Sequence, residues 1–174
     1  MSKYDIVLAP DPVLKKLATP LERIDDETRQ LMDDMIDTMY DGQGIGLAAP
    51  QIALSKRLLV LDVEQDEEKD SGNPQVFANP EILWSSDDPN IYNEGCLSIP
   101  GHYAEIERPK IIRVKYLDYD GKQQEIEADG LLATCLQHEI DHLDGVLFID
   151  YLSTLKRNMI IKKMKKSKKN ISAL

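Results

Sequence analysis

Apolar residues recur with helical spacing in two stretches of this chain. Residues 26–41 place six large apolar or aromatic side chains on one helical face: Leu31, Met32, Met35, Ile36, Met39 and Tyr40. This pattern predicts an amphipathic helix that begins at an aspartate cap and ends at Gly42. Residues 131–143 repeat the pattern with leucines, and we expect a second helix there, with Asp129 as its N-cap and Gly145 as its stop.

The remaining apolar runs have the length and composition of strands. We expect strands at five places: residues 57–63, 75–83, 103–107, 111–118 and 122–128. Asp120-Gly121 predicts a hairpin turn between the last two strands, whereas the polar residues 64–74 predict a loop. Too few helices separate the strands for a parallel βαβ array. The pattern therefore predicts one α+β domain with mostly antiparallel strands.

Residues 151–174 differ in charge from the rest of the chain. They hold eight basic side chains and no acidic one, whereas residues 1–150 hold 13 basic and 31 acidic side chains, a net charge of -18. Four apolar residues in this tail recur at near-helical spacing: Leu155, Met159, Ile160 and Met164. We expect an amphipathic helix whose apolar stripe docks on the body. Its basic face either keeps the protein soluble or binds a polyanion such as nucleic acid or a ribonucleoprotein.

Composition narrows the class of protein. A chain of 174 residues with 42% hydrophobic and 30% charged side chains has room for one folded domain with an ordinary core. Two cysteines are too few for the disulfide framework of a small secreted protein. We expect no secretory signal and no membrane partner, because no apolar run approaches the roughly 20 residues of a membrane helix. A cytoplasmic protein is therefore expected.

Residues 138–142 form an H-E-x-x-H pattern on the second predicted helix. Residues four apart share a helix face, so His138 and His142 can both bind one metal ion. Glu139 follows the first histidine, where a carboxylate can act as a general base on metal-bound water. Two of the three histidines in the chain lie in this pattern, which favours a metal site over a chance match.

A catalytic metal ion of this kind has three protein ligands and an open position. Phe148 stands where HExxHxxGxxH enzymes have their third histidine, and no carboxylate follows Asp150, so a downstream ligand is excluded. Cys135 lies on the same helix, but the seven residues to His142 span about 10.5 Å, whereas metal–ligand bonds measure about 2.0–2.3 Å. Cys96, in a loop-like segment between strands, is left as the third ligand. We expect Cys135 to pack beside the site or to line a pocket.

Residues 42–51 contain three glycines in the spacing G-x-G-x-G. This spacing follows a helix rather than a strand, so it does not fit a dinucleotide-binding fingerprint. We expect a strand whose missing side chains let a substrate approach the backbone, with a plain surface loop as the alternative. Gln51 would place a neutral amide donor near the metal, which suits an oxyanion that forms only in the transition state.

Three segments together resemble the signature motifs of the peptide deformylase family: GIGLAAPQ at 44–51, EGCLS at 94–98 and QHEIDH at 137–142. Their order and spacing match as well, and the resemblance covers nearly the whole chain. It implies a hydrolase that removes the N-formyl group from the formylmethionine of nascent proteins and releases formate. It also implies antiparallel sheets packed around a central helix that carries HExxH. Residues 1–150 would form the catalytic domain, and 151–174 a basic helix of the same domain.

The resemblance assigns the metal site as well. Three residues would bind the metal: Cys96, His138 and His142. The ion would be Fe2+, one per chain, for which Ni2+, Co2+ or Zn2+ can substitute. Glu139 would be the general acid/base when metal-bound water attacks the formyl carbon.

The resemblance further implies substrate contacts and a partner. Gln51 and the backbone N–H of Leu97 would form the oxyanion hole, and four residues would contact the substrate: Ile45, Gly46, Leu131 and Cys135. In deformylases of the Gram-negative type, a C-terminal helix docks on the ribosome near the exit tunnel. This favours the ribosome, rather than DNA or a membrane, as the partner of the basic tail.

Two other functions remain open from the residues alone. The chain could be an HExxH metallopeptidase that cuts internal peptide bonds, or a metal-stabilised binding module without turnover. Structural metal sites are closed, so a glutamate beside an open position argues against the binding module.

No function is assigned to the acidic loop at 64–74, and His102 is expected at the surface or behind the metal ligands.

Overall fold

The computed structural model describes residues 4–172, with side chains up to residue 167. Within these residues the larger sheet has the order β1 (Gly46–Ala48), β2 (Leu58–Leu61), β3 (Gln75–Ser85), β6 (Ile111–Leu117) and β7 (Gln123–Asp129). The smaller sheet pairs β4 (Pro89–Cys96) with β5 (Ile99–Pro109). The α-helices are α1 (Asp26–Asp41), α2 (Gly130–Leu143) and α3 (Thr154–Ser172), and the short 3-10 helices are η1 (Pro12–Lys15), η2 (Ala49–Ile52) and η3 (Phe148–Tyr151). All strand pairs are antiparallel, which confirms the predicted α+β class.

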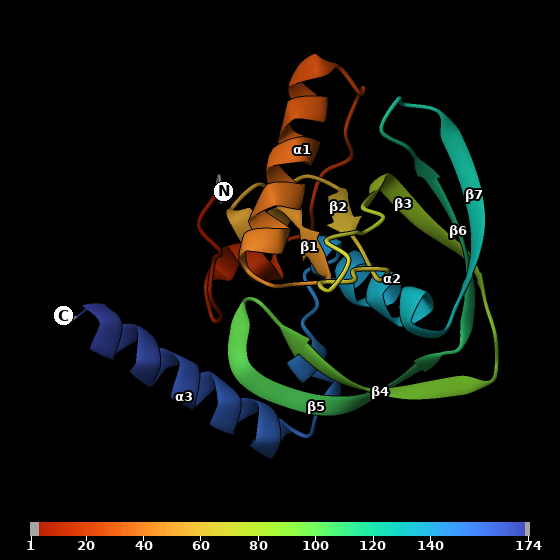
Figure 1. Cartoon of the computed structure of the whole chain (residues 1–174). Coiled ribbons are helices and arrows are strands. Elements are labelled where there is room, and N and C mark those ends of the chain that lie inside the picture. The colour runs from red at the N-terminus through yellow and green to blue at the C-terminus, as the bar shows by residue number, and fades with distance from the viewer. Residues whose placement is uncertain (1–3, 173–174) are drawn as a thin grey trace.

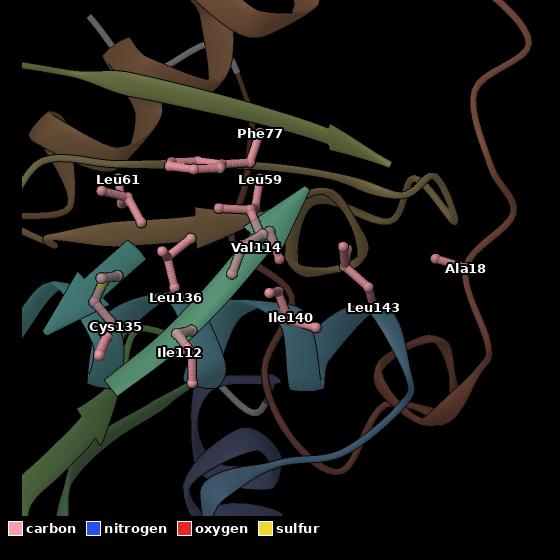
Figure 2. Close-up of a cluster of buried hydrophobic side chains, with 13 residues drawn as sticks. Ala18, Leu59, Leu61, Phe77, Ile112, Val114, Cys135, Leu136, Ile140 and Leu143 are labelled. Carbon is pink, nitrogen blue, oxygen red and sulfur yellow. The ribbon is translucent and has the colours of Figure 1, made fainter. Parts of the chain in front are cut away.

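Helix α2 lies in the middle of the molecule, between the curved five-stranded sheet and the β4–β5 hairpin (Figure 1). Its apolar side chains face the sheet, and Figure 2 shows Leu136 and Ile140 among the buried side chains of β2, β3 and β6. Removal of this apolar surface from water is the main force that holds the helix in place. The opposite side of α2 therefore carries its polar motif residues into the interior, where His138, Glu139 and His142 are 8%, 4% and 1% exposed.

Local sequence features set the ends of α1. The Asp25 carboxylate accepts hydrogen bonds from the backbone N–H of Thr28 at 2.9 Å and from its hydroxyl at 2.8 Å, as an N-cap residue should. The helix ends at Gly42, as predicted, and the N–H of Gly42 donates to the carbonyl of Thr38. The chain then turns directly into β1, so α1 leads the glycine-rich segment toward the centre of the molecule.

The segment around Cys96 is the end of a strand, so the prediction of a loop there is wrong. β4 pairs with β5 along its length, and Cys96 lies opposite Ile99. The sequence of β4 is rich in Pro, Asn and Gly, residues that are depleted in strands, which is why its pattern does not indicate one. Pairing with β5 overrides that propensity. A register shift between Glu94 and Cys96 marks an irregularity at Gly95, at the start of the EGCLS segment.

The tail is helical, as its spacing predicts, but its apolar residues are divided between two sides of α3. Met164 is 4% exposed and, with Ile160 and Ile161, packs against the N-terminal segment. Leu155 and Met159 are 72% and 51% exposed, so the prediction that the whole stripe docks is wrong for these two residues. The predicted basic side chains of residues 168 and 169 lie outside the described residues. Neither α3 nor any other helix in residues 4–172 has the apolar length of a membrane crossing.

Candidate metal centre and adjoining cavity

Three donor atoms converge where α2 meets the end of β4. The Sγ of Cys96 and one ring nitrogen each of His138 and His142 lie within 4.8 Å of one another. The Sγ of Cys96 is 3.4 Å from Nε2 of His142. The two imidazoles share a face of α2 one turn apart, and packing of the hairpin against α2 brings Cys96 to them. The structure therefore brings together the three residues that the sequence predicts as metal ligands.

Glu94 and Arg108 fix the orientation of His138 from the side of its ring that faces away from the cluster. Oε1 of Glu94 lies 2.9 Å from Nδ1 of His138, which leaves Nε2 free to face the cluster. Arg108 donates to both oxygens of Glu94, at 2.7 and 3.0 Å, and also to Asp141 at 2.8 Å. The hydroxyl of Tyr151 donates to the same oxygen of Asp141 at 2.6 Å. A carboxylate that orients a metal-binding histidine is a usual feature of such sites.

The sequence patterns do not indicate these four residues around His138. Glu94 and Asp141 lie inside the EGCLS and HEIDH segments, so their place in the motifs could have indicated them. Arg108 and Tyr151 stand in segments that carry no motif. Only the packing of β5 against α2, and of η3 against β5, shows that they reach the site.

The charges of the cluster suit a bound cation. Burial alone would lower the pKa of His138, but hydrogen bonds to Cys96 and Glu94 outweigh burial and raise this pKa to about 10. Burial and the neighbouring His138 hold the pKa of His142 well below its usual range. The surroundings thus favour one positive charge between Cys96 and Glu94. A divalent metal ion would supply that charge and leave both imidazoles neutral, so this donor set fits a metal ion.

Glu139 packs directly against Gly46. A Cβ atom on residue 46 would lie 2.6 Å from Oε1 of Glu139, so only glycine leaves room for the carboxylate. Burial raises the pKa of Glu139 to about 7. Its other oxygen, Oε2, is buried without a hydrogen-bond partner among the described residues. A carboxyl group with a pKa near neutrality can both accept and donate a proton, which is what an acid/base catalyst must do.

Gln51 presents an amide N–H beside Cys96. Its Nε2 donates to the Sγ of Cys96 at 3.4 Å and to the hydroxyl of Ser98 at 3.1 Å. Its Oε1 accepts from a backbone N–H of β1 at 2.9 Å, which fixes the orientation of the amide. Leu97 follows in the turn between β4 and β5, and a Cβ atom on Gly44 would lie 2.7 Å from its Cδ1. The glycine segment and the EGCLS segment therefore approach each other closely at this point.

A cavity of about 460 Å³ adjoins the cluster. Its wall comes from the glycine segment, from the β4–β5 hairpin and from α2. All four predicted substrate contacts line it: Ile45, Gly46, Leu131 and Cys135. Burial raises the pKa of the Cys135 thiol, whose S–H donates to the carbonyl of Ile45 at 3.8 Å. His102, to which the sequence assigns no definite role, also lines the cavity.

A Gly46→Ala substitution tests the contact with Glu139. The added methyl group must displace the carboxylate, and an error of about 1 Å at a reacting group costs roughly 100-fold in rate. We expect kcat of the metal-loaded protein to fall by roughly 100-fold, while the metal content per chain stays unchanged. In a Glu139→Ala background the same substitution should have little further effect, because the group that it displaces is gone. An equal loss in both backgrounds would show that Gly46 acts without Glu139.

Comparison with known proteins identifies the family. The profile of the family described as polypeptide deformylase matches residues 3–158 of this chain. The chain belongs to this family. The peptide deformylase of Rhizobium meliloti is 57% identical over 173 residues, which cover 99% of this chain and 98% of that protein. The peptide deformylase of Bartonella tribocorum is 56% identical over 169 residues, which cover 97% and 95%.

Solved structures of polypeptide deformylases share the fold. The crystal structure of the enzyme from Ehrlichia chaffeensis superimposes with a TM-score of 0.90 at 44% identity, over 96% of this chain and 97% of that one. The structure of the same enzyme in complex with actinonin gives a TM-score of 0.89 at 46% identity, over 96% and 98%. These likenesses confirm the resemblance that the three motifs indicate. They also identify the chain as a hydrolase of this family.

Proposed function

We propose that this chain removes the formyl group from the N-terminal formylmethionine of nascent proteins and releases formate. One observation carries the proposal. The Cys96–His138–His142 cluster lies beside Glu139, and a cavity of about 460 Å³ adjoins both. The site thus combines metal donors, an acid/base and room for a substrate, whereas a closed structural metal site offers no such room.

We propose roles for the residues around the scissile amide. When bound, a metal ion supplies Lewis acidity toward the formyl oxygen and lowers the pKa of water. Glu139 takes the proton of the attacking water and delivers it to the leaving amine. Nε2 of Gln51 and the backbone N–H of Leu97 donate hydrogen bonds to the oxyanion, where fixed neutral donors stabilise charge that appears only in the transition state.

The methionine side chain would enter the cavity between the glycine segment and α2. Ile45, Leu131 and Cys135 supply its apolar wall. Among the residues that the structure describes, β1 lies at the end of the five-stranded sheet and pairs only with β2, so its other edge is available to an extended peptide. Addition of a peptide to a free strand edge is a common recognition mode.

We propose Fe2+ as the resident metal, with Ni2+, Co2+ or Zn2+ able to substitute. One thiolate and two imidazoles form a donor set that suits first-row divalent ions. Cys96, His138 and His142 would hold the ion, and Glu94 would orient the first histidine. A thiolate ligand is sensitive to oxidation, so elemental analysis of protein purified without oxygen is the appropriate test of metal identity.

Product analysis tests the proposed reaction against the two alternatives. The metal-loaded protein is incubated with a formyl-methionyl peptide and with the same peptide lacking the formyl group, and the products are identified by mass spectrometry. A deformylase releases formate from the first peptide and leaves the second intact. Cleavage of an internal bond in either peptide would indicate a metallopeptidase. Binding without any product would indicate a binding module.

We propose that α3 brings the protein to the ribosome near the exit tunnel, which would place its activity in the cytoplasm. Among its described side chains the helix carries five exposed lysines, Lys156, Lys162, Lys163, Lys165 and Lys166, whereas the body is acidic. A basic helix on a body of net charge -18 would direct an RNA-rich surface to the helix alone. The exposed Leu155 and Met159 add an apolar element to this surface.

Substitution of the exposed lysines of α3 tests the ribosome proposal. Removal of the helix would uncover the cluster around Met164, so surface substitutions are the cleaner change. Four lysines on the exposed surface are replaced by glutamine: Lys162, Lys163, Lys165 and Lys166. We expect ribosome co-sedimentation to be lost at moderate salt while turnover of a short formyl peptide is unchanged. The matched Lys→Arg variant should still co-sediment, and retained binding by the glutamine variant would contradict the proposal.

A further inference from the structure

The acidic loop between β2 and β3 comprises residues 62–74 in the structure, and it reaches back to the cavity wall. The side chain of Gln65 donates from Nε2 to the carbonyl of Gly44 at 3.0 Å and to the carbonyl of Asp62 at 3.1 Å. The backbone N–H of Asp62 donates to the carbonyl of Ile45 at 2.8 Å. Gly44 and Ile45 both line the cavity, so two successive carbonyl groups of its wall are held by this one loop.

A buried carboxylate at the start of the loop keeps it in place. Asp62 is fully buried, and its Oδ2 accepts from the hydroxyl of Tyr40 at 2.6 Å and from the N–H of Asn73 at 3.0 Å. Its Oδ1 accepts from the N–H of Glu64 at 2.9 Å. Burial and the bond to Asp62 raise the pKa of Tyr40, so the phenol stays a donor. The carboxylate therefore joins the end of α1 to both ends of the loop.

The loop is closed tightly around Asp62. A Cβ atom on Gly72 would lie 2.3 Å from Oδ2 of Asp62, so a side chain there would collide with the carboxylate. The amide of Asn73 also donates to the carboxylate of Glu64 at 2.7 Å, which ties the two ends of the loop together. A buried, fully hydrogen-bonded carboxylate is a rigid anchor, because breaking one of its bonds would leave a buried charge without a partner.

We infer that Gln65 is a positioning residue for substrate binding, and that the acidic loop serves as a brace for the peptide-binding edge of the cavity. The inference rests on the proposed peptide substrate. The segment before β1 lies outside the regular β1–β2 ladder, which begins at Gly46. Without the donor of Gln65, the carbonyl of Gly44 has no other hydrogen bond to fix it within the described residues, and the glycines on either side of Ile45 would let the backbone turn. Bonds from the N–H of Gly44 to the carbonyl of Met39 and from the N–H of Asp62 to the carbonyl of Ile45 would remain, so the wall would keep its course but lose the bond that orients the Gly44 carbonyl.

This role predicts weaker peptide binding with an unchanged reaction centre. Gln65→Leu removes the donor at similar size, and loss of one net hydrogen bond corresponds to a roughly three- to tenfold change in an equilibrium constant. We expect KM for a formyl-methionyl tripeptide to rise by about this factor, with kcat and metal content unchanged. Gln65→Glu keeps the shape but sets a carboxylate against two carbonyl oxygens, so its KM should rise at least as much.

The experiment combines two readouts on the metal-loaded protein. Calorimetry gives the Kd of the unformylated methionyl tripeptide, and formate release gives KM and kcat. Glu68→Leu, at an exposed position of the same loop, is the matched control and should behave as wild type. Equal Kd values for wild type and Gln65→Leu would overturn the inference, as would a parallel fall in kcat and metal content, which indicates general damage. Absence of formate release by wild type would instead contradict the proposed function.

Discussion

A Glu139→Ala variant should lose roughly 10²- to 10⁴-fold in kcat while it keeps its metal ion. That range is what a positioned acid/base contributes to a reaction. The carboxyl group has a pKa raised by burial to about 7 and an oxygen with no hydrogen-bond partner among the described residues, and it lies beside the cluster without being one of its three donors. Formate release measures the loss, and elemental analysis measures the retained metal.

Glu139→Gln separates proton transfer from packing in this experiment. Glutamine fills the same space against Gly46 but cannot take a proton from water, so its kcat should fall nearly as far as that of the alanine variant. Turnover within tenfold of wild type in either variant would contradict the assigned role. A loss of metal from both variants would indicate that Glu139 acts as a ligand instead.

A Cys96→Ser variant should lose most of its metal, whereas Cys135→Ser should keep it. The thiol of Cys96 lies 3.4 Å from Nε2 of His142, inside the donor cluster. Cys135 is buried at the cavity wall, its pKa is raised by burial, and it donates to a carbonyl group, so it is not poised to be a thiolate ligand. Loss of a direct ligand should reduce affinity by more than the roughly 10- to 100-fold that loss of an outer partner costs.

The two serine variants control for each other, because each replaces one sulfur with one oxygen. Metal per chain is measured after dialysis against a weak chelator, and circular dichroism checks that both variants are folded. Cys135→Ser should show at most a moderate rise in KM, since it changes only the cavity wall. The reverse ranking of metal content would mean that the wrong cysteine has been assigned.

The parts of the fold that the sequence predicts are those set by short-range patterns. The apolar spacing of residues 26–41 and the aspartate before them are enough to place α1, and its cap is the one observed. The HExxH pattern puts two imidazoles one turn apart, which needs no tertiary information. Cys96 follows by elimination, because the helical rise excludes Cys135 as a partner of His142.

The parts that the sequence does not predict depend on long-range pairing. β4 has poor strand propensity and exists because β5 pairs with it. Arg108 reaches Glu94 only through this pairing, so nothing near Arg108 in the sequence indicates its place beside the Cys96–His138–His142 cluster. Gln65 is similar: its loop is polar and unremarkable in composition, and its hydrogen bond to Gly44 depends on how the chain folds back after β2.

The most direct test of the account is the release of formate from a formyl-methionyl peptide by the wild-type protein loaded with Fe2+ under exclusion of oxygen. We expect one formate for each new methionine amino terminus, with the rest of the peptide left whole. A metal-loaded, folded protein that releases no formate, or that liberates internal fragments instead, would contradict the proposed function.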